Sequence, residues 1–139
     1  MDFVKGLQRA IDYIENHLAD EIDYERIAQQ AACSTFYFQR IFSALCDMPV
    51  GDYIRKRRLT LAGRDLNINK EKVIDVALKY GYESPEAFTR AFSKFHGITP
   101  SEAKLNGFKL KSFTRLSVQI TMKVGNAMDY KVVEKQAFI

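Results

Sequence analysis

One stretch of helix-forming sequence occurs twice in this chain, at an offset of fifty residues. Residues 34–47 fall on residues 84–97 when they are shifted by that distance. The matching pairs are Ser34 and Ser84, Phe38 and Phe88, Arg40 and Arg90, Phe42 and Phe92, and Ser43 and Ser93. Matches at positions expected to be buried and at positions expected to be exposed are hard to obtain by chance. We therefore interpret the two segments as copies of one structural unit.

Each copy has the outline of a short helix, a tight turn and a longer helix. Upstream of the matched segments, Ile27-Ala28 pairs with Val76-Ala77, with one extra residue in the second turn. This is the outline of a helix-turn-helix. A single outline would be weak evidence, because any helical hairpin could produce it. Two copies favour a pair of helix-turn-helix subdomains.

Hydrophobic residues recur at helical spacing through most of the first hundred residues, which predicts an all-α fold of about seven helices. In the first part of the chain we expect a helix that ends near Asp20, a short helix capped by Asp23 and a helix over about 34–45. A linker helix from about Asp52 to Leu66 follows. The last three expected helices are one closed by Gly81, one capped by Ser84 and ended by Gly97, and a short one that a capping box at Thr99–Glu102 begins. The side chains expected to face inward include Tyr24, Ile27, Phe38, Ile41, Phe42 and Leu45 in the first subdomain and Phe88, Ala91, Phe92 and Phe95 in the second.

Charge is distributed unevenly along the chain. The net charge is +4, but residues 1–30 carry seven acids and three bases, a net of −4, which leaves +8 for residues 31–139. A basic body favours a polyanionic partner, although a basic face that is simply solvated is an equal alternative on charge alone. Cys33 and Cys46 fit buried free thiols in a reducing compartment.

The outward faces of the two longer helices carry side chains suited to reading DNA. Gln and Arg can donate pairs of hydrogen bonds to adenine and guanine, and Thr and Glu can also contact base edges. The predicted base-contacting residues are Thr35, Phe36, Gln39, Arg40, Pro85, Glu86, Thr89 and Arg90. The alternatives are that Arg40 and Arg90 form intrahelical salt bridges and that Phe36 belongs to the core.

The linker helix contains the basic run Arg55-Lys56-Arg57-Arg58, whose members cannot all lie on one helix face. The predicted phosphate-contacting residues are Ser34, Ser43, Arg55, Arg57, Arg58, Ser84 and Lys94. At about 1.5 Å per residue, roughly fifteen helical residues span about 22 Å. Such a spacer could place the helices at about 34–45 and 84–95 in successive major grooves, which lie about 34 Å apart.

Several motifs together resemble one known family, and the resemblance covers about two thirds of the chain. They are S-x-x-x-F-x-R-x-F at 34–42, YIRKRRLTLA at 53–62, VIDVALKYGY at 73–82 and SPEAFTRAFSKFHGITP at 84–100. They are similar to the DNA-binding domain of AraC/XylS-type bacterial transcriptional regulators. The resemblance implies seven helices in two helix-turn-helix subdomains, with the third and sixth helices reading double-stranded DNA. It also implies RNA polymerase as a partner if the protein is an activator. One departure is Asp47, which stands where the family usually has Gly.

The last part of the chain has a different pattern. Apolar residues alternate from Leu116 to Val124, Gly125-Asn126 suggests a turn, and Met128 could begin a second strand. We expect residues 1–106 to form the DNA-binding domain (1–51, linker 52–67, and 68–106) and 107–139 to form a short β-type extension. MDYKVVEKQAF resembles the opening strand of a GyrI-like effector-binding domain. Any small-molecule effector would then act through a C-terminal domain that this chain mostly lacks.

An enzyme is not expected from this sequence. His17 and His96 are the only histidines, and neither lies in a recognisable nucleophile, metal or phosphate-loop motif. His96 is expected at a helix C-terminus, where it would interact with the helix dipole. No metal, cofactor, signal peptide or membrane span is predicted, which favours a cytoplasmic protein. The alternative function is a helical protein–protein interaction module.

Overall fold

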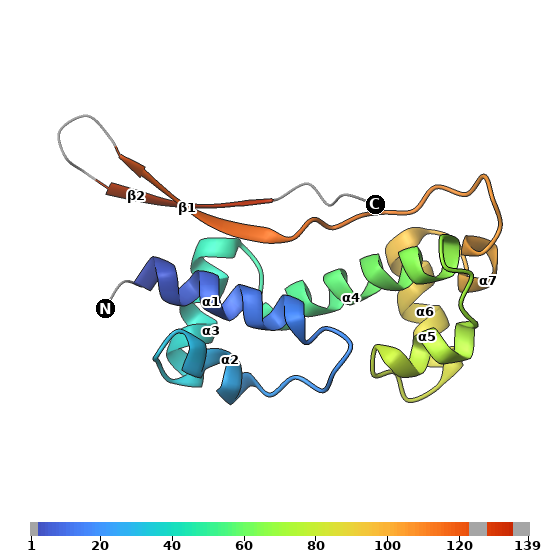
Figure 1. The fold of residues 1–139 in the computed structure, drawn as a ribbon, viewed down its shortest axis with the longest axis horizontal. Coiled ribbons are helices and arrows are strands. Elements are labelled where there is room, and N and C mark those ends of the chain that lie inside the picture. The colour runs from blue at the N-terminus through green and yellow to red at the C-terminus, as the bar shows by residue number, and fades with distance from the viewer. Residues whose placement is uncertain (1–2, 123–127, 135–139) are drawn as a thin grey trace. The chain divides into compact units, whose positions relative to one another are not determined.

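The computed structural model describes residues 3–122 and 128–134 (Figure 1). Within these residues the fold is mostly helical, as the sequence predicts, with a short β extension. The elements are α1 (Phe3–Asn16), α2 (Tyr24–Gln30), α3 (Thr35–Cys46), α4 (Val50–Asn67), α5 (Val73–Lys79), α6 (Pro85–His96), α7 (Pro100–Ala103), β1 (Leu116–Met122) and β2 (Met128–Glu134).

Two helix boundaries differ from the prediction. The first helix ends at Asn16 rather than near Asp20. A tight turn closes it, in which the His17 N–H donates to the Ile14 carbonyl at 3.0 Å. The linker helix begins at Val50 rather than Asp52, because the Pro49 carbonyl already accepts from the N–H groups of Asp52 and Tyr53 at 3.0 and 3.2 Å.

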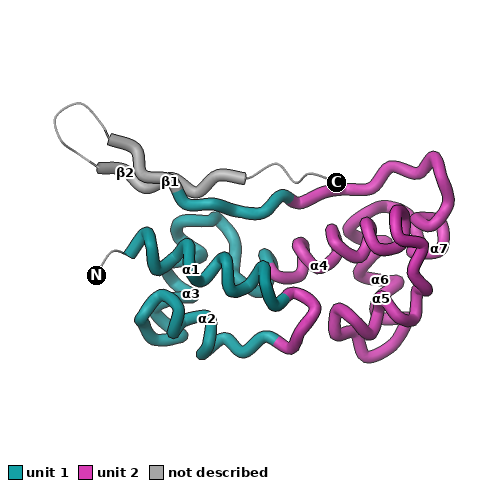
Figure 2. Tube along the Cα trace, in the orientation of Figure 1, with its two compact units in different colours: residues 1–17, 22–53, 114–137 teal, residues 18–21, 54–113, 138–139 magenta. Residues whose placement is uncertain are grey.

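The chain divides into two compact units (Figure 2). Unit 1 comprises residues 1–17, 22–53 and 114–137, and unit 2 comprises 18–21, 54–113 and 138–139. Helix α4 therefore belongs to unit 1 up to Tyr53 and to unit 2 from Ile54 onward. Each unit contains one helix-turn-helix, with α2 and α3 in unit 1 and α5 and α6 in unit 2.

Unit 1 has an aromatic and aliphatic core around Tyr53. The Tyr53 ring centre lies 5.8 Å from that of Phe42, and the Tyr53 hydroxyl donates to Glu15 Oε2 at 2.7 Å. Residues that are completely buried in this core include Leu7, Ile11, Ile14, Ile27, Phe42 and Tyr53.

Two residues predicted to face this core do not. Tyr24 is 38% exposed and Leu45 is 37% exposed. Tyr24 is the first residue of α2, and its hydroxyl lies 2.8 Å from the place where a Cβ on Gly51 would stand. Leu45 lies in the last turn of α3, where Phe38 and Phe42 already fill the buried face.

Unit 2 buries the corresponding face of α6 against α4 and α5. Its core consists of Leu59, Ala62, Leu66, Val76, Ala77, Tyr80, Phe88, Phe92 and Ala103. Asp65 of α4 joins this core to α5, because its Oδ2 accepts from the Tyr80 hydroxyl at 2.6 Å and from Lys79 Nζ at 2.9 Å. Lys79 also pairs with Glu71 at 2.8 Å, so its ammonium group lies between two carboxylates.

The turns after α3 and α6 adopt the same left-handed conformation with different residues. Asp47 has a φ of 58° and Gly97 a φ of 78°, and each N–H donates to the carbonyl of the serine four residues earlier. Asp tolerates this region better than most residues. The left-handed turn after α3 is therefore preserved, although Asp47 stands where the family usually has Gly. Gly81, with a φ of 82°, confirms the predicted end of the fifth helix.

The C-terminal extension packs onto α1 within unit 1. Strands β1 and β2 pair antiparallel, from Leu116 opposite Glu134 to Met122 opposite Met128. The Leu116 N–H donates to the Tyr53 hydroxyl at 3.2 Å, the Val118 N–H donates to Gln8 Oε1 at 2.7 Å, and Arg115 pairs with Asp12. The two predicted strands are confirmed. The predicted turn at Gly125-Asn126 and Val124 before it lie outside the described residues.

Just before β1, residues 111–113 are held within unit 2 by side chains of α4 and α6. The Lys111 N–H donates to His96 Nδ1 at 3.0 Å, and the Phe113 N–H donates to Thr60 Oγ1 at 2.9 Å. The carbonyl of Phe113 accepts from the Arg57 guanidinium at 2.6 Å. No helix in the described part of the chain is long and apolar enough to cross a membrane.

Candidate nucleic-acid interface

Helix α3 presents the predicted base-contacting residues of the first copy at the surface. Ser34 caps the helix, with its Oγ accepting from the Tyr37 N–H at 3.1 Å, which fixes where the first turn begins. Phe36 and Arg40 are exposed, and Thr35 and Gln39 are half-buried. Phe36 and Arg40 therefore lie away from the buried face formed by Phe38 and Phe42, and Thr35 and Gln39 lie beside that face.

Phe36 is not a core residue. It is 71% exposed, and the guanidinium carbon of Arg40 lies 5.6 Å from its ring centre. This cation–π contact orients Arg40 along the outer face of α3 without neutralising its charge. Within the described residues neither Arg40 nor Arg90 forms an ion pair, which removes the salt-bridge alternative for both there.

Helix α6 repeats this arrangement with better-defined ends. Ser84 Oγ accepts from the Ala87 N–H at 3.1 Å, Pro85 occupies the first turn and Gly97 ends the helix, all as predicted. Pro85, Glu86 and Arg90 are exposed and Thr89 is half-buried. Glu86 lies in the first helical turn, where the helix dipole favours an acidic side chain, so it has a local structural role as well as a predicted contact.

The predicted phosphate contacts fall into two groups. Arg55, Lys94 and Ser34 are exposed, and Ser43 and Ser84 are half-buried, so each of the five reaches the surface. Ser34 and Ser84 also cap their helices, which commits their side-chain oxygens to backbone N–H groups.

The other group, Arg57 and Arg58, is engaged by the protein itself. Arg57 is only 6% exposed and its guanidinium binds the Phe113 carbonyl. Arg58 donates to the carbonyls of Leu18 and Asp20 at 2.9 and 2.8 Å, in the segment before α2 that belongs to unit 2. The burial of Arg57 argues against the predicted phosphate contact, because a buried guanidinium cannot reach a DNA backbone without leaving its carbonyl partner.

Two residues of unit 2 have roles that sequence reasoning missed. No contact is predicted for Lys56 from the sequence, but its Nζ lies 5.2 Å from the Phe113 ring centre in a cation–π contact. His96 is 5% exposed, and its Nε2 lies 2.8 Å from the Leu59 carbonyl. The burial of His96 lowers its pKa, and Lys111 lowers it further while the Leu59 hydrogen bond opposes both. His96 is the last residue of α6, as expected, but the lowered pKa disfavours the charged form that would interact best with the helix dipole.

Among the described residues no three His, Cys, Asp or Glu side chains are placed to hold a metal ion. Cys33 and Cys46 are free and half-buried. Burial, with a smaller contribution from Asp47, raises the pKa of the Cys46 thiol to about 12, so this thiol is unreactive at neutral pH.

Comparison with known proteins gives the same family by sequence and by fold. The model of the helix-turn-helix domain family matches residues 27–105. The chain is 42% identical over 100 residues to YbfP of Bacillus subtilis, named an uncharacterised HTH-type transcriptional regulator, covering 72% of this chain and 34% of that protein. It is 33% identical over 102 residues to the regulatory protein SoxS of Escherichia coli K12, covering 73% of this chain and 95% of SoxS.

A solved structure adds agreement in fold. The DNA-binding domain of AdpA, a global transcriptional factor solved in complex with a target DNA, superposes with a TM-score of 0.65 at 26% identity, covering 72% of this chain and 90% of that one. These relatives are named as transcription regulators, in agreement with a role that is not enzymatic. The chain belongs to the helix-turn-helix family of AraC-type transcriptional regulators.

Proposed function

We propose that this chain binds double-stranded DNA at specific sequences and thereby regulates transcription. The observation that carries this proposal is the pair of helix-turn-helix motifs, each with an exposed Arg at the same position of its second helix, Arg40 in α3 and Arg90 in α6. The complex of AdpA with its target DNA supports the same use of this fold. Each unit would insert its second helix into a major groove.

In unit 1 the proposed base contacts come from Thr35, Phe36, Gln39 and Arg40. Arg40 can donate two hydrogen bonds to a guanine edge, and Gln39 can pair with adenine. Phe36 offers its ring to a thymine methyl group while its other side supports Arg40 at 5.6 Å. The stacked arrangement lowers the entropy that Arg40 loses when it binds, because the side chain is already oriented.

In unit 2 the proposed base contacts come from Pro85, Glu86, Thr89 and Arg90. Arg90 supplies the guanine contact equivalent to that of Arg40, and Thr89 supplies a hydroxyl and a methyl group. Glu86 can accept from the amino group of cytosine, and it would repel the phosphates if it were turned toward them. We therefore propose that α6 prefers a cytosine near its N-terminus.

The proposed phosphate contacts are Ser34, Ser43, Arg55, Ser84 and Lys94. Lys94 and Arg55 are exposed and positively charged, which suits contacts that position the protein on DNA without reading its sequence. For Arg57 and Arg58 we now favour a structural role, because their guanidinium groups hold backbone carbonyls of unit 2.

Other parts of the proposal concern the whole regulator. We propose residues 1–106 as the DNA-binding domain and 107–139 as an extension that leads toward a further, effector-binding domain. If the protein activates transcription, RNA polymerase would be its partner, and the protein would work in the cytoplasm on nucleoid DNA.

Selection from a randomised duplex pool tests this function directly. We expect enrichment of an asymmetric site with two short preferred blocks roughly one helical turn apart. Binding to the selected site should weaken steeply with salt, because phosphate contacts release counterions. A pool that shows no enrichment after repeated rounds, with folded protein confirmed by circular dichroism, would overturn the proposal and favour a protein–protein interaction module.

A further inference from the structure

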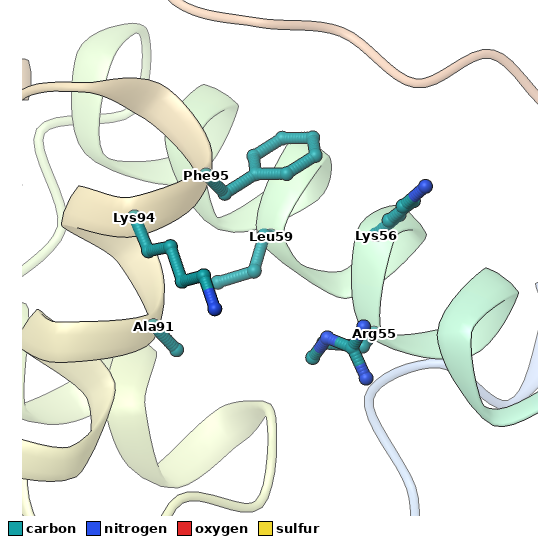
Figure 3. A pocket seen from close by; sticks show the side chains of 6 residues that line it. All are labelled: Arg55, Lys56, Leu59, Ala91, Lys94 and Phe95. Atoms are coloured by element: carbon teal, nitrogen blue, oxygen red, sulfur yellow. The ribbon is translucent and has the colours of Figure 1, made fainter.

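Unit 2 contains a cavity between α4 and α6 that combines positive charge with an apolar floor (Figure 3). Its volume is about 410 Å³, within the range of small-molecule sites. The residues that line it are Arg55, Lys56, Leu59, Ala91, Lys94 and Phe95. None of these six side chains is acidic.

The lining side chains converge from the two helices. Figure 3 shows Lys94 extending from α6 and Arg55 from α4 toward the same space, with Leu59 behind them. Leu59 is 2% exposed and forms part of the core, so the floor of the cavity is fixed. Arg55 and Lys94 are both exposed, so the charged groups stand at the entrance.

The internal repeat shows that this cavity is not required by the fold. At the offset of fifty residues, Ala91 corresponds to Ile41 and Lys94 to Ala44. Helix α6 therefore has a smaller side chain and an added positive charge at two positions that line the cavity. Because α3 adopts the same helix with a larger aliphatic residue and no charge there, both differences are specific to the second copy.

The combination selects a chemical class of ligand. An inorganic anion would use Arg55 and Lys94 and leave the apolar floor unused, and a neutral apolar molecule would leave both cations unused. We propose that this cavity binds organic anions, with a carboxylate or sulfonate between Arg55 and Lys94 and an aromatic or short aliphatic body on Leu59, Ala91 and Phe95. Charge-assisted hydrogen bonds would hold the head group, and burial of apolar surface would hold the body.

Such a ligand would also regulate DNA binding, a consequence that rests on the proposed function. Arg55 and Lys94 are proposed phosphate contacts, so an organic anion in the cavity and a DNA phosphate would compete for the same two side chains. A bound anion should therefore weaken DNA binding at every sequence rather than change the preferred site.

The test of the cavity uses the fluorescent anion anilinonaphthalene sulfonate without DNA. The chain has no Trp, so the fluorescence of the bound probe is read without transfer from tryptophan. We expect saturable binding to the folded protein, and weaker binding of the neutral analogue phenylnaphthylamine. Lys94→Gln should raise the Kd of the anion about tenfold, since it removes one charge-assisted contact.

Two further variants separate the cavity from the general positive charge of the surface. Lys109→Gln makes the same change at an exposed lysine that does not line the cavity, and should leave the Kd of the anion unchanged. Ala91→Leu keeps every charge but fills the cavity, and should abolish binding. Equal weakening by Lys94→Gln and Lys109→Gln would overturn the proposal, as would full binding to a folded Ala91→Leu protein. If Ala91→Leu lowers the Tm, the comparison of the two lysine variants decides.

A competition experiment tests the link to DNA separately. Labelled duplex from the randomised pool is titrated with the protein at increasing concentrations of anilinonaphthalene sulfonate. We expect the probe to lower DNA affinity for the wild type and to have a smaller effect on Lys94→Gln. Probe binding in the cavity with no effect on DNA affinity would overturn the regulatory link alone. Probe binding by a protein that does not bind DNA would overturn the proposed function and leave the cavity assignment standing.

Discussion

At the scale of single residues, Gly63 allows α4 and α6 to approach each other within unit 2. A Cβ at this position would lie 3.0 Å from His96 Nε2 and 3.3 Å from Leu110 Cδ1. His96 cannot move aside easily, because hydrogen bonds hold both of its ring nitrogens. Although alanine is favoured over glycine in a helix by about 1 kcal/mol, we expect Gly63→Ala to lower the free energy of unfolding by about 1–3 kcal/mol.

Urea unfolding measures this effect. Arg64→Ala, at the exposed neighbouring position of the same helix, serves as the control and should change the free energy of unfolding by less than about 0.5 kcal/mol. A Gly63→Ala protein as stable as the wild type would show that the contact between Gly63 and His96 is not tight.

His96 gives the protein a pH dependence of stability that can be measured. Its Nδ1 accepts from the Lys111 N–H, and its Nε2 lies 2.8 Å from the Leu59 carbonyl, which fits a neutral ring that donates from Nε2. Burial lowers the pKa of His96 below 6.5, so the unfolded chain takes up a proton at higher pH than the folded one. The stability that depends on neutral His96 is therefore fully present above about pH 6.5 and is lost as the pH falls through the lower folded pKa.

Urea unfolding of the wild type and of His96→Phe at about pH 7.5 and about pH 5.5 isolates this effect. Phenylalanine fills a similar volume but does not titrate, and His17 is present in both proteins. The loss of unfolding free energy on acidification should be larger for the wild type. Equal losses in the two proteins would assign the pH dependence to other groups.

At the scale of secondary-structure elements, α2 and α5 occupy the same place in the two copies but have different outer faces. Ile74 and Leu78 of α5 are 53% and 66% exposed. Their counterparts in α2 are Glu25 and Gln29, which are also exposed. Because polar residues serve at these positions in α2, the double substitution Ile74→Glu with Leu78→Gln should change the free energy of unfolding by no more than about 0.5 kcal/mol.

Thermal unfolding followed by circular dichroism checks this prediction. Val76→Ala, on the completely buried face of the same helix, is the contrasting variant and should cost more than about 1 kcal/mol. If the double variant were destabilised as much as Val76→Ala, the outer face of α5 would have to contribute to the fold.

The basic residues of α4 and α6 should separate into structural and DNA-contacting ones. Arg57→Ala removes a buried guanidinium and leaves the Phe113 carbonyl without this donor, so it should lower the free energy of unfolding by about 1–3 kcal/mol. Lys94→Ala should leave the Tm unchanged and weaken binding to all DNA sequences alike. It should also reduce the slope of log affinity against log salt concentration by about one. Thermal unfolding and a salt titration of DNA binding measure the two effects. A stable Arg57→Ala protein with weakened DNA binding would restore Arg57 as a phosphate contact.

At the scale of the whole molecule, local patterns predicted the helices better than they predicted which charged groups are buried. The repeat located α3 and α6, and the caps at Ser84, Gly97 and Thr99 were correct because each depends on neighbours within a few residues. The burial of Arg57 was not predicted, because its partner, Phe113, lies 56 residues away. The burial of His96 was not predicted for the same reason, since Leu59 is 37 residues from it.

The same difference between local signals and distant contacts explains why Leu45 is more exposed than predicted. The repeat matches Leu45 to Phe95 and predicts that both side chains face inward, but Leu45 is 37% exposed. A match between two sequence positions does not determine how much neighbouring structure covers either of them. Helix periodicity gives the direction in which a side chain points, whereas its burial depends on what packs against that face. The base contacts predicted for α3 and α6 likewise depend on how DNA packs against these helices, so they stay predictions.

In the proposed function, α3 and α6 each read their own part of one DNA site. Selection from a randomised duplex pool with the wild type, Arg40→Ala and Arg90→Ala measures this most directly. We expect the wild type to recover two preferred blocks, Arg90→Ala to lose preference in one block only, at a cost of about 1–3 kcal/mol, and Arg40→Ala to lose preference in the other. Loss of both blocks in either variant, with the fold intact, or no change of preference in both variants would contradict it.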